Sequence, residues 1–221
     1  MSEKEKVFKE LPHKSLSDAA LSAIRKAILE GALKPGQRLV EAEIARQMGI
    51  SRAPVREALR QLEKEGLIST EPHKGSYVIQ LSADDLWEIY TLRAAIEGLG
   101  AELAALKATE EEIKQLEELV EAMRQSAQEG DLSRLVEQDL AFHECLCKAS
   151  RHKRLFDIWL SMNAQIKLFI NITDQFHLPA EDVVRRHEDV VKAIRERDGE
   201  RAKRLISRDI IEVGREICAQ A

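Results

Sequence analysis

The sequence predicts a mostly α fold in two parts, a short mixed segment followed by an all-helical antiparallel bundle. Apolar residues recur at helical spacing along most of the 221 residues, and aromatic residues make up only 4%. The stretch with a strand pattern is residues 67–80, where β-forming residues flank a Pro-His-Lys-Gly turn. This length suits one large domain or two small ones.

In the first part we expect three helices, over residues 16–31, 41–48 and 52–65. Gly49 ends the second helix as a left-handed cap, and Ser51 is placed to cap the start of the third. Pro54 falls in the first turn of that helix, where its missing N–H costs little. Strands then follow over residues 67–71 and 76–80. Three helices and a hairpin in this order make a winged helix-turn-helix.

In the second part we expect six helices, over residues 83–107, 110–128, 132–149, 152–173, 180–197 and 199–218. Ser82 with Asp85, and Thr109 with Glu112, have the spacing of a capping box. Long helices joined by short links pack as an antiparallel bundle.

The chain therefore divides into a flexible tail (1–14), a winged helix-turn-helix domain (15–80) and a helical domain (82–219). Charge divides in the same way. Residues 1–80 contain 14 basic and 11 acidic residues, whereas the whole chain contains 34 and 39. A basic first part in an acidic protein indicates a polyanionic partner for that part.

Composition also indicates a compartment. No run approaches the roughly 18 apolar residues that span a bilayer, and the charged start MSEKEKVFKE has no apolar signal core. Cys145, Cys147 and Cys218 make no disulfide framework, so we expect free thiols. These features predict a cytoplasmic protein with no membrane partner.

Four cations recur every four residues on the third helix and form a row along one side: Arg52, Arg56, Arg60 and Lys64. Most such rows are solvated helix faces. In a helix-turn-helix, however, this helix enters the DNA major groove with its N-terminal residues against the bases. Arg52 and Arg56 are expected there, because an arginine pairs with guanine O6 and N7. Arg60 and Lys64 contact phosphate, pair with glutamates or stay in solvent.

The stretch GISRAPVREALRQLEKEGLI, with LKPGQRLVEAEIARQMG before it and HKG after it, resembles the DNA-binding domain of the GntR family of transcription regulators. The resemblance implies that this domain binds double-stranded operator DNA. The expected DNA-binding residues include the wing tip and are Ser51, Arg52, Pro54, Arg56, Arg60, Lys74 and Gly75. Ala42 stands where some members carry an arginine that contacts the operator.

A second set of residues has metal-ligating types. Asp139 and His143 lie four residues apart on one helix face, which Cys147 continues, and His187 opens a later helical pattern. A carboxylate and imidazole set suits Zn²⁺, Ni²⁺ or a similar divalent metal. An Asp and a His at this spacing are also common as an ordinary pair, so spacing leaves both interpretations open.

The segments IYTLRAAIEGLGAELAA, DLAFHECL and RRHEDVVKAIRERDGERAKRLI resemble the FCD-type effector domain of the FadR subgroup of GntR regulators. The resemblance implies a divalent metal (Zn, Ni, Mn or Fe) whose ligands are Asp139, His143, His187 and Asp209. Asp209 stands where the family usually has a histidine.

The resemblance also implies a small carboxylate effector beside the metal, with Arg93 as its basic partner; an ion pair with Glu97 is the alternative role for Arg93. The resulting hypothesis is a homodimeric transcription regulator, most often a repressor in this family, and not an enzyme. The alternative is a metal-dependent helical enzyme acting on a small carboxylate. Such an enzyme would need an open coordination position and a general base.

Overall fold

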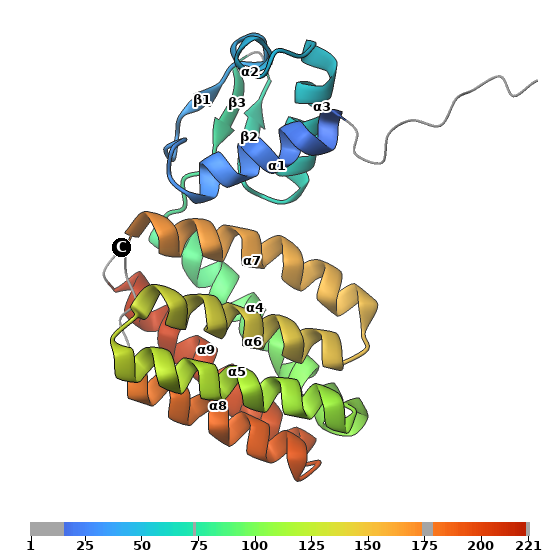
Figure 1. Cartoon of the computed structure of the whole chain (residues 1–221), viewed down its shortest axis with the longest axis vertical. Coiled ribbons are helices and arrows are strands. Elements are labelled where there is room, and N and C mark those ends of the chain that lie inside the picture. The colour runs from blue at the N-terminus through green and yellow to red at the C-terminus, as the bar shows by residue number, and fades with distance from the viewer. Residues whose placement is uncertain (1–15, 73, 174–178, 220–221) are drawn as a thin grey trace, which may run out of the picture. The chain divides into compact units, whose positions relative to one another are not determined.

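The structure, a computed structural model, describes residues 16–72, 74–173 and 179–219 (Figure 1). The expected tail over residues 1–14 and the hairpin residue 73 lie outside this part. The described residues form two compact units that divide between Gln80 and Leu81, and each unit is considered by itself.

The first unit contains three helices and three strands within its described residues. The helices are α1 (Leu16–Leu29), α2 (Glu41–Met48) and α3 (Arg52–Lys64), and the strands are β1 (Arg38–Leu39), β2 (Ile68–Glu71) and β3 (Gly75–Val78). The sheet is antiparallel in the order β1-β3-β2, so the expected hairpin is extended by a third strand. Sequence periodicity missed β1 because two residues carry no repeat.

The apolar faces of α1, α3 and the hairpin share one core, which includes Ala20, Ile24, Ile28, Val55, Ala58, Leu62, Leu67 and Val78. Arg25 of α1 binds Glu65, just past α3, through two hydrogen bonds of 2.8 and 2.9 Å. This packing fixes α3 by its apolar face. The opposite face, which carries the arginine row, remains exposed.

Helices α1 and α8 end two residues earlier than expected, and the cap of α3 also differs. Gly49 adopts the left-handed conformation (φ 67°) that ends α2. Ser51 occupies the extended cap position of α3, but its side chain makes no capping hydrogen bond. The hydroxyl of Ser51 therefore does not satisfy the first N–H groups of α3.

The second unit consists of six helices within its described residues: α4 (Ala83–Lys107), α5 (Glu110–Glu129), α6 (Leu132–Ala149), α7 (Lys153–Thr173), α8 (Ala180–Arg195) and α9 (Gly199–Cys218). Both expected capping boxes, at the starts of α4 and α5, are present. None of the described helices is both long and apolar enough to cross a bilayer.

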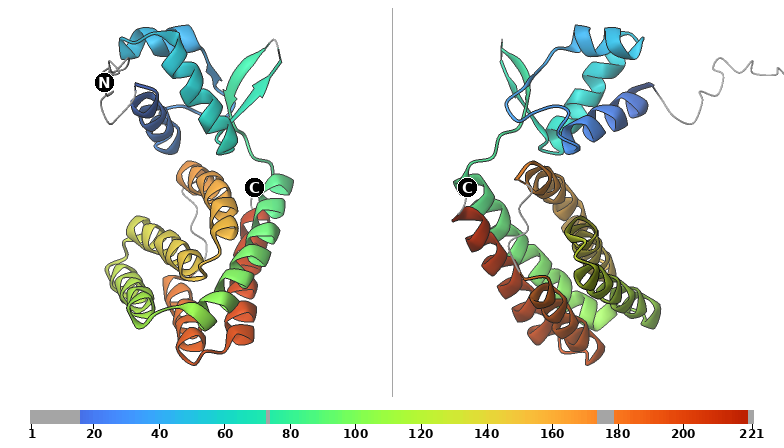
Figure 2. Two further views of the ribbon diagram at one scale, coloured as in Figure 1. Left: turned by 90° about the vertical axis from the view of Figure 1, so that its right-hand side faces the viewer. Right: turned by 60° about the vertical axis from the view of Figure 1, so that its left-hand side comes forward.

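Helix α4 is central to this bundle and lies beside α9 over much of its length (Figure 2). Gly214 allows the close approach, because a Cβ there would lie 2.7 Å from Cβ of Tyr90. The core between the helices includes Leu86, Ala101, Leu116, Phe142 and Ile206. Polar side chains of α4 that point into this apolar core therefore need hydrogen-bond or ion-pair partners.

Candidate functional site

The exposed side of α3 in the first unit presents the expected arginine row. Arg52 and Arg60 are exposed and hydrogen-bond to no other residue in the part of the chain that the structure describes. Pro54 lies in the first turn of α3, as expected. With the Ser51 hydroxyl uncommitted, the start of α3 offers backbone N–H groups and the guanidinium group of Arg52 to an anion, and Arg60 lies two turns further along.

Arg56 differs from its two neighbours because it already has a partner. Its guanidinium makes a bidentate ion pair with Glu41, the first residue of α2, with Nε–Oε1 at 2.9 Å and Nη2–Oε2 at 2.8 Å. This hydrogen bonding lowers the pKa of Glu41, to which Arg52 and Arg60 also contribute. Glu41 therefore orients Arg56 and reduces the net positive charge of the row.

The hairpin tip is organised by Lys74 and Gly75. Lys74 is exposed, forms an ion pair of 2.7 Å with Glu71, and its carbonyl accepts a hydrogen bond from Tyr77. Gly75 has φ 113°, and Nε of Arg38 lies 3.3 Å from where a Cβ would be. Arg38 of β1 therefore adds a cation beside Gly75, and the sequence-based set of DNA-binding residues did not include it.

In the second unit a single buried carboxylate, Glu97 of α4, gathers donors from three helices. It accepts hydrogen bonds from Nε of Arg93, Nδ1 of His143 and Nε1 of Trp159, the last at 2.8 Å. Burial alone would raise the pKa of Glu97, but Arg93 and His143 outweigh it and lower the pKa to about 2. Glu97 therefore remains ionised at neutral pH and holds the side chains around it.

Asp139, His143 and His187 converge on one point from α6 and α8. Nε2 of His187 lies 3.2 Å from Oδ1 of Asp139 and 3.4 Å from Nε2 of His143, which is itself 3.7 Å from Asp139. Ligands bound to one tetrahedral Zn²⁺ at roughly 2.1 Å lie about 3.4 Å apart. The three groups thus have the spacing of a metal-ligand set.

The outer ring nitrogens of both histidines are already engaged. Nδ1 of His187 donates to the carbonyl of Val183 at 2.8 Å, and Nδ1 of His143 donates to Glu97. Each Nε2 consequently turns toward the shared point, as in metal centres where an outer partner orients each histidine. Burial would lower the pKa of His143, but Glu97 and Asp139 raise it to about 9. The arrangement therefore selects a cation at this point, either a proton or a metal ion.

The structure does not bring Asp209, the fourth expected ligand, into this group. Its Oδ1 accepts a hydrogen bond of 3.1 Å from Arg186, which also pairs with Glu212 at 2.9 Å. Arg186 thus binds the side chain of Asp209, which is shorter than the histidine that relatives of the resembled family usually carry at this position. Cys147 also lies outside the group, and burial raises the pKa of its thiol.

Arg93 combines the two roles that the sequence left open. Its Nε binds Glu97, whereas its buried Nη2 has no hydrogen-bond partner among the described residues. The guanidinium lies 5.8 Å from the ring of Tyr90 and is electrostatically coupled to Asp139. Nε of Arg93 is therefore structural, whereas Nη2 is available to a ligand near Asp139.

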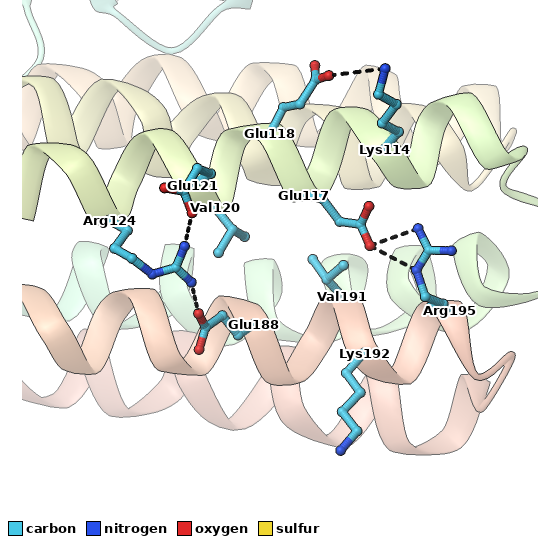
Figure 3. A pocket seen from close by; sticks show the side chains of 10 residues that line it. All are labelled: Lys114, Glu117, Glu118, Val120, Glu121, Arg124, Glu188, Val191, Lys192 and Arg195. Carbon is cyan, nitrogen blue, oxygen red and sulfur yellow. Dashed lines mark hydrogen bonds and ion pairs between the residues drawn. The ribbon is translucent and has the colours of Figure 1, made fainter.

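The surface of this unit also has a groove of about 600 Å³ between α5 and α8 (Figure 3). Its charges pair with one another: Arg195 binds Glu117 at 2.7 Å, and Arg124 binds Glu121 and Glu188. Such exposed pairs contribute little individually to stability.

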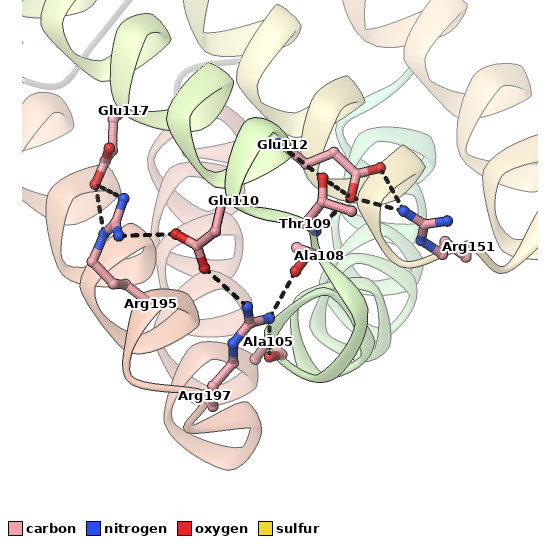
Figure 4. A network of polar contacts seen from close by, with 9 residues as sticks. All are labelled: Ala105, Ala108, Thr109, Glu110, Glu112, Glu117, Arg151, Arg195 and Arg197. Atoms are coloured by element: carbon pink, nitrogen blue, oxygen red, sulfur yellow. Dashed lines mark hydrogen bonds and ion pairs between the residues drawn. The ribbon is translucent and has the colours of Figure 1, made fainter.

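At one end of the bundle a related network joins the helix ends (Figure 4). Arg197, between α8 and α9, donates to the carbonyls of Ala105 and Ala108 at 3.2 and 2.8 Å and pairs with Glu110. It thereby satisfies carbonyl groups at the end of α4. This network is structural and supports the helix that carries Glu97.

Each of the two units matches the model of a known protein family. Residues 16–78 match the family model "Bacterial regulatory proteins, gntR family", and residues 88–211 match the model "FCD domain". An uncharacterised HTH-type transcriptional regulator of Bacillus subtilis, YdhC, is 34% identical over 83% of this chain and 82% of its own length.

A probable D-xylose utilization operon transcriptional repressor of Paenarthrobacter nicotinovorans is 30% identical over 83% of this chain and 80% of its own length. Among solved structures, a putative GntR transcriptional regulator from Rhodococcus sp. RHA1 has a TM-score of 0.76 at 23% identity. That similarity covers 94% of this chain and 100% of the other, and at this identity it concerns the fold.

Replacement of Glu97 by alanine should destabilise the second unit by about 3–5 kcal/mol, because it leaves Arg93 buried without its counter-charge. Urea unfolding followed by tryptophan fluorescence measures this, since both tryptophans lie in the second unit. Glu102→Ala removes the more exposed ion pair with Lys203 and should cost only about 0–1 kcal/mol. Equal losses in the two variants would contradict the central role of Glu97.

Proposed function

The chain belongs to the GntR family of bacterial transcription regulators, in the group that carries an FCD domain. On that premise we propose a separate function for each of its two units. It is a DNA-binding transcription regulator. The first unit binds operator DNA, and the second binds a divalent metal together with a small organic acid that controls DNA binding. Relatives named as transcriptional repressors support repression as the function here. The protein acts in the cytoplasm, where the DNA lies.

The observation that carries the proposal is the convergence of Asp139, His143 and His187 beside the free Nη2 of Arg93. Imidazole and carboxylate together suit Zn²⁺, Ni²⁺, Mn²⁺ or Fe²⁺. A metal held by these three residues supplies positive charge and open coordination positions for a carboxylate. Arg93 donates to the same carboxylate, while Asp209 remains with Arg186.

For DNA recognition we propose that Arg52 and Arg56 contact bases, that Arg60 contacts phosphate, and that Ser51 and Lys74 fix the backbone on either side. Glu41 acts as a positioning residue, since it holds Arg56 in an extended pose before DNA binds. On binding, guanine O6 and N7 can replace the two Glu41 oxygens as acceptors.

Regulation follows from the connection between the units. Only residues 79–82 separate β3 of the wing from α4, which carries Arg93 and Glu97. An acid that prefers one arrangement of α4 against α6 and α8 shifts the population toward that arrangement and alters operator affinity. Both domains and the named relatives belong to regulators, so we favour this over the alternative of a metal-dependent enzyme.

We also propose that the regulator works as a homodimer and that α4 contributes to the dimer interface. Leu92, Leu99 and Leu106 recur every seven residues on α4 and are exposed by 51%, 39% and 65%. A seven-residue apolar stripe is the pattern that pairs helices. Because α4 has Asp85 at its start and Lys107 at its end, antiparallel pairing of two copies brings opposite charges together.

Arg52→Ala and Arg56→Ala should each reduce discrimination between the preferred DNA and single-base variants by about 1–3 kcal/mol. Arg60→Ala should instead weaken binding to all sequences and reduce the salt slope by about one. DNA fragments selected from a random pool provide the substrate. Arg204→Ala, an equal charge change on α9, is the control, and unchanged sequence preference in both arginine variants would refute the assignment.

Metal analysis of the purified protein should find about one divalent ion per chain. Loss of a residue that hydrogen-bonds to a metal ligand typically weakens metal binding by roughly 10- to 100-fold. His143→Ala and His187→Ala remove a ligand itself and should weaken metal binding by more than this. Asp209→Asn and the exposed-residue control His152→Ala should retain the ion. Equal metal content in wild type and His143→Ala would remove the proposed centre.

Leu99→Glu should raise the dimer dissociation constant by at least about 30-fold, because it places a charge at the centre of an apolar contact. Sedimentation velocity across a concentration series measures this change. Leu132→Glu alters an exposed leucine on α6, outside the α4 stripe, and should leave the dimer intact. A dimer of unchanged affinity in Leu99→Glu would exclude the α4 stripe as the interface.

A further inference from the structure

Four buried polar atoms in the second unit remain without partners among the described residues: Nη2 of Arg93, Oγ of Ser126, Oε1 of Gln138 and Oδ1 of Asn163. Arg93 and Asn163 are each only 5% exposed. Buried polar groups in native proteins almost always have a hydrogen-bond partner, so an orphan pair in one region calls for an explanation such as a ligand.

Contacts between α4 and α7 establish how the two helices are aligned. Nε1 of Trp159 donates to Glu97, and Cδ2 of Leu155 lies 3.7 Å from where a Cβ on Gly100 would be. The helices run antiparallel, so the sequence number rises on one as it falls on the other (Figure 1). Leu155 is thus level with Gly100, and Trp159 with Glu97.

One helical turn beyond these contacts, the same alignment brings Asn163 of α7 level with Arg93 of α4. Arg93 lies four residues before Glu97 on α4, and Asn163 lies four residues after Trp159 on α7. Residues four apart lie on the same face of a helix. The orphan donor and the orphan acceptor therefore belong to one layer of the bundle.

The metal-ligand group belongs to this layer as well. Along α4 and α6, Gly100 meets Cys147 and Glu97 binds His143, so these helices run parallel and residues about 46 positions apart are level. Asp139 is accordingly level with Arg93. The layer thus contains metal ligands, a free cationic donor and, from α7, a free amide.

We propose that the acid bound here is a hydroxy acid and that Asn163 selects it by binding its hydroxyl group. This inference rests on the proposed function, in which the metal and Arg93 hold the carboxylate. It adds a specificity-determining residue on a helix that contributes neither to the metal-ligand group nor to the basic partner.

The chemistry favours a hydroxyl over other substituents. A hydroxyl group both donates and accepts, so it satisfies the amide of Asn163 in either orientation of that side chain. An unsubstituted acid of the same length leaves the buried amide unpaired, which costs binding free energy. We therefore expect a hydroxy acid to bind about tenfold more tightly, or better, than its unsubstituted partner.

Calorimetric titration and thermal shifts on the Zn²⁺-loaded full chain test the inference. The probes are matched pairs of two- to six-carbon acids that differ only by hydroxylation, such as lactate with propionate and malate with succinate. This comparison is made within the wild-type protein, so it decides the matter even if a variant is unstable.

Asn163→Leu supplies the second measurement, because leucine has the same branched shape and number of side-chain heavy atoms and no polar atom. The variant should bind members of a pair within about threefold of each other, and its melting temperature without acid should equal or exceed that of wild type. Ser126→Ala removes another unpartnered buried atom, on α5, and should keep the wild-type preference.

The outcomes separate this inference from the proposed function. Preference for hydroxy acids that disappears in Asn163→Leu supports the assignment. Equal binding of both members of every pair in wild type overturns it and leaves the carboxylate site standing. Absence of binding by every acid, with Zn²⁺ bound, overturns both.

Discussion

The ionised carboxylate of Glu97 is the constraint on which the second unit depends. A buried charge is tolerated only with full compensation, and Glu97 obtains it from Arg93, His143 and Trp159 on three helices. Each partner is thereby oriented for a further task. His143 turns its other nitrogen toward His187, Arg93 keeps one nitrogen free, and Trp159 aligns α7 with α4. The candidate metal centre and the proposed acid site therefore share side chains that Glu97 orients.

The first unit uses the same physical device at an exposed position. Glu41 orients Arg56 on the surface that is to meet DNA, as Glu97 orients His143 in the interior. The energetic consequences differ because of solvent. The exposed pair can exchange its partner for a base at little cost, whereas the buried set cannot lose a member without destabilising the bundle. The proposed DNA-binding surface and the proposed ligand site thus both contain cations that a carboxylate orients, one exposed to solvent and one buried.

Local sequence patterns predicted most of the fold because helices, caps and the hairpin are encoded within a few residues. Gly49 and both capping boxes are examples. Patterns at helical spacing also identified the side chains of α6 that converge with His187. They could not predict that Trp159 would reach Glu97, or that Arg186 would bind Asp209, because such contacts join residues far apart in the sequence. The β1 strand was missed for the same reason, since only its pairing with β3 defines it.

In the proposed mechanism, occupancy of the metal and acid site changes DNA affinity. The most direct test measures the dissociation constant of the Zn²⁺-loaded protein for a DNA fragment selected from a random pool, with and without the tightest-binding acid. We expect a change of about 5- to 150-fold, and an equal change in acid affinity when DNA is bound, because coupling between sites is reciprocal. An acid that binds the metal-loaded protein while DNA affinity remains unchanged would rule out this mechanism.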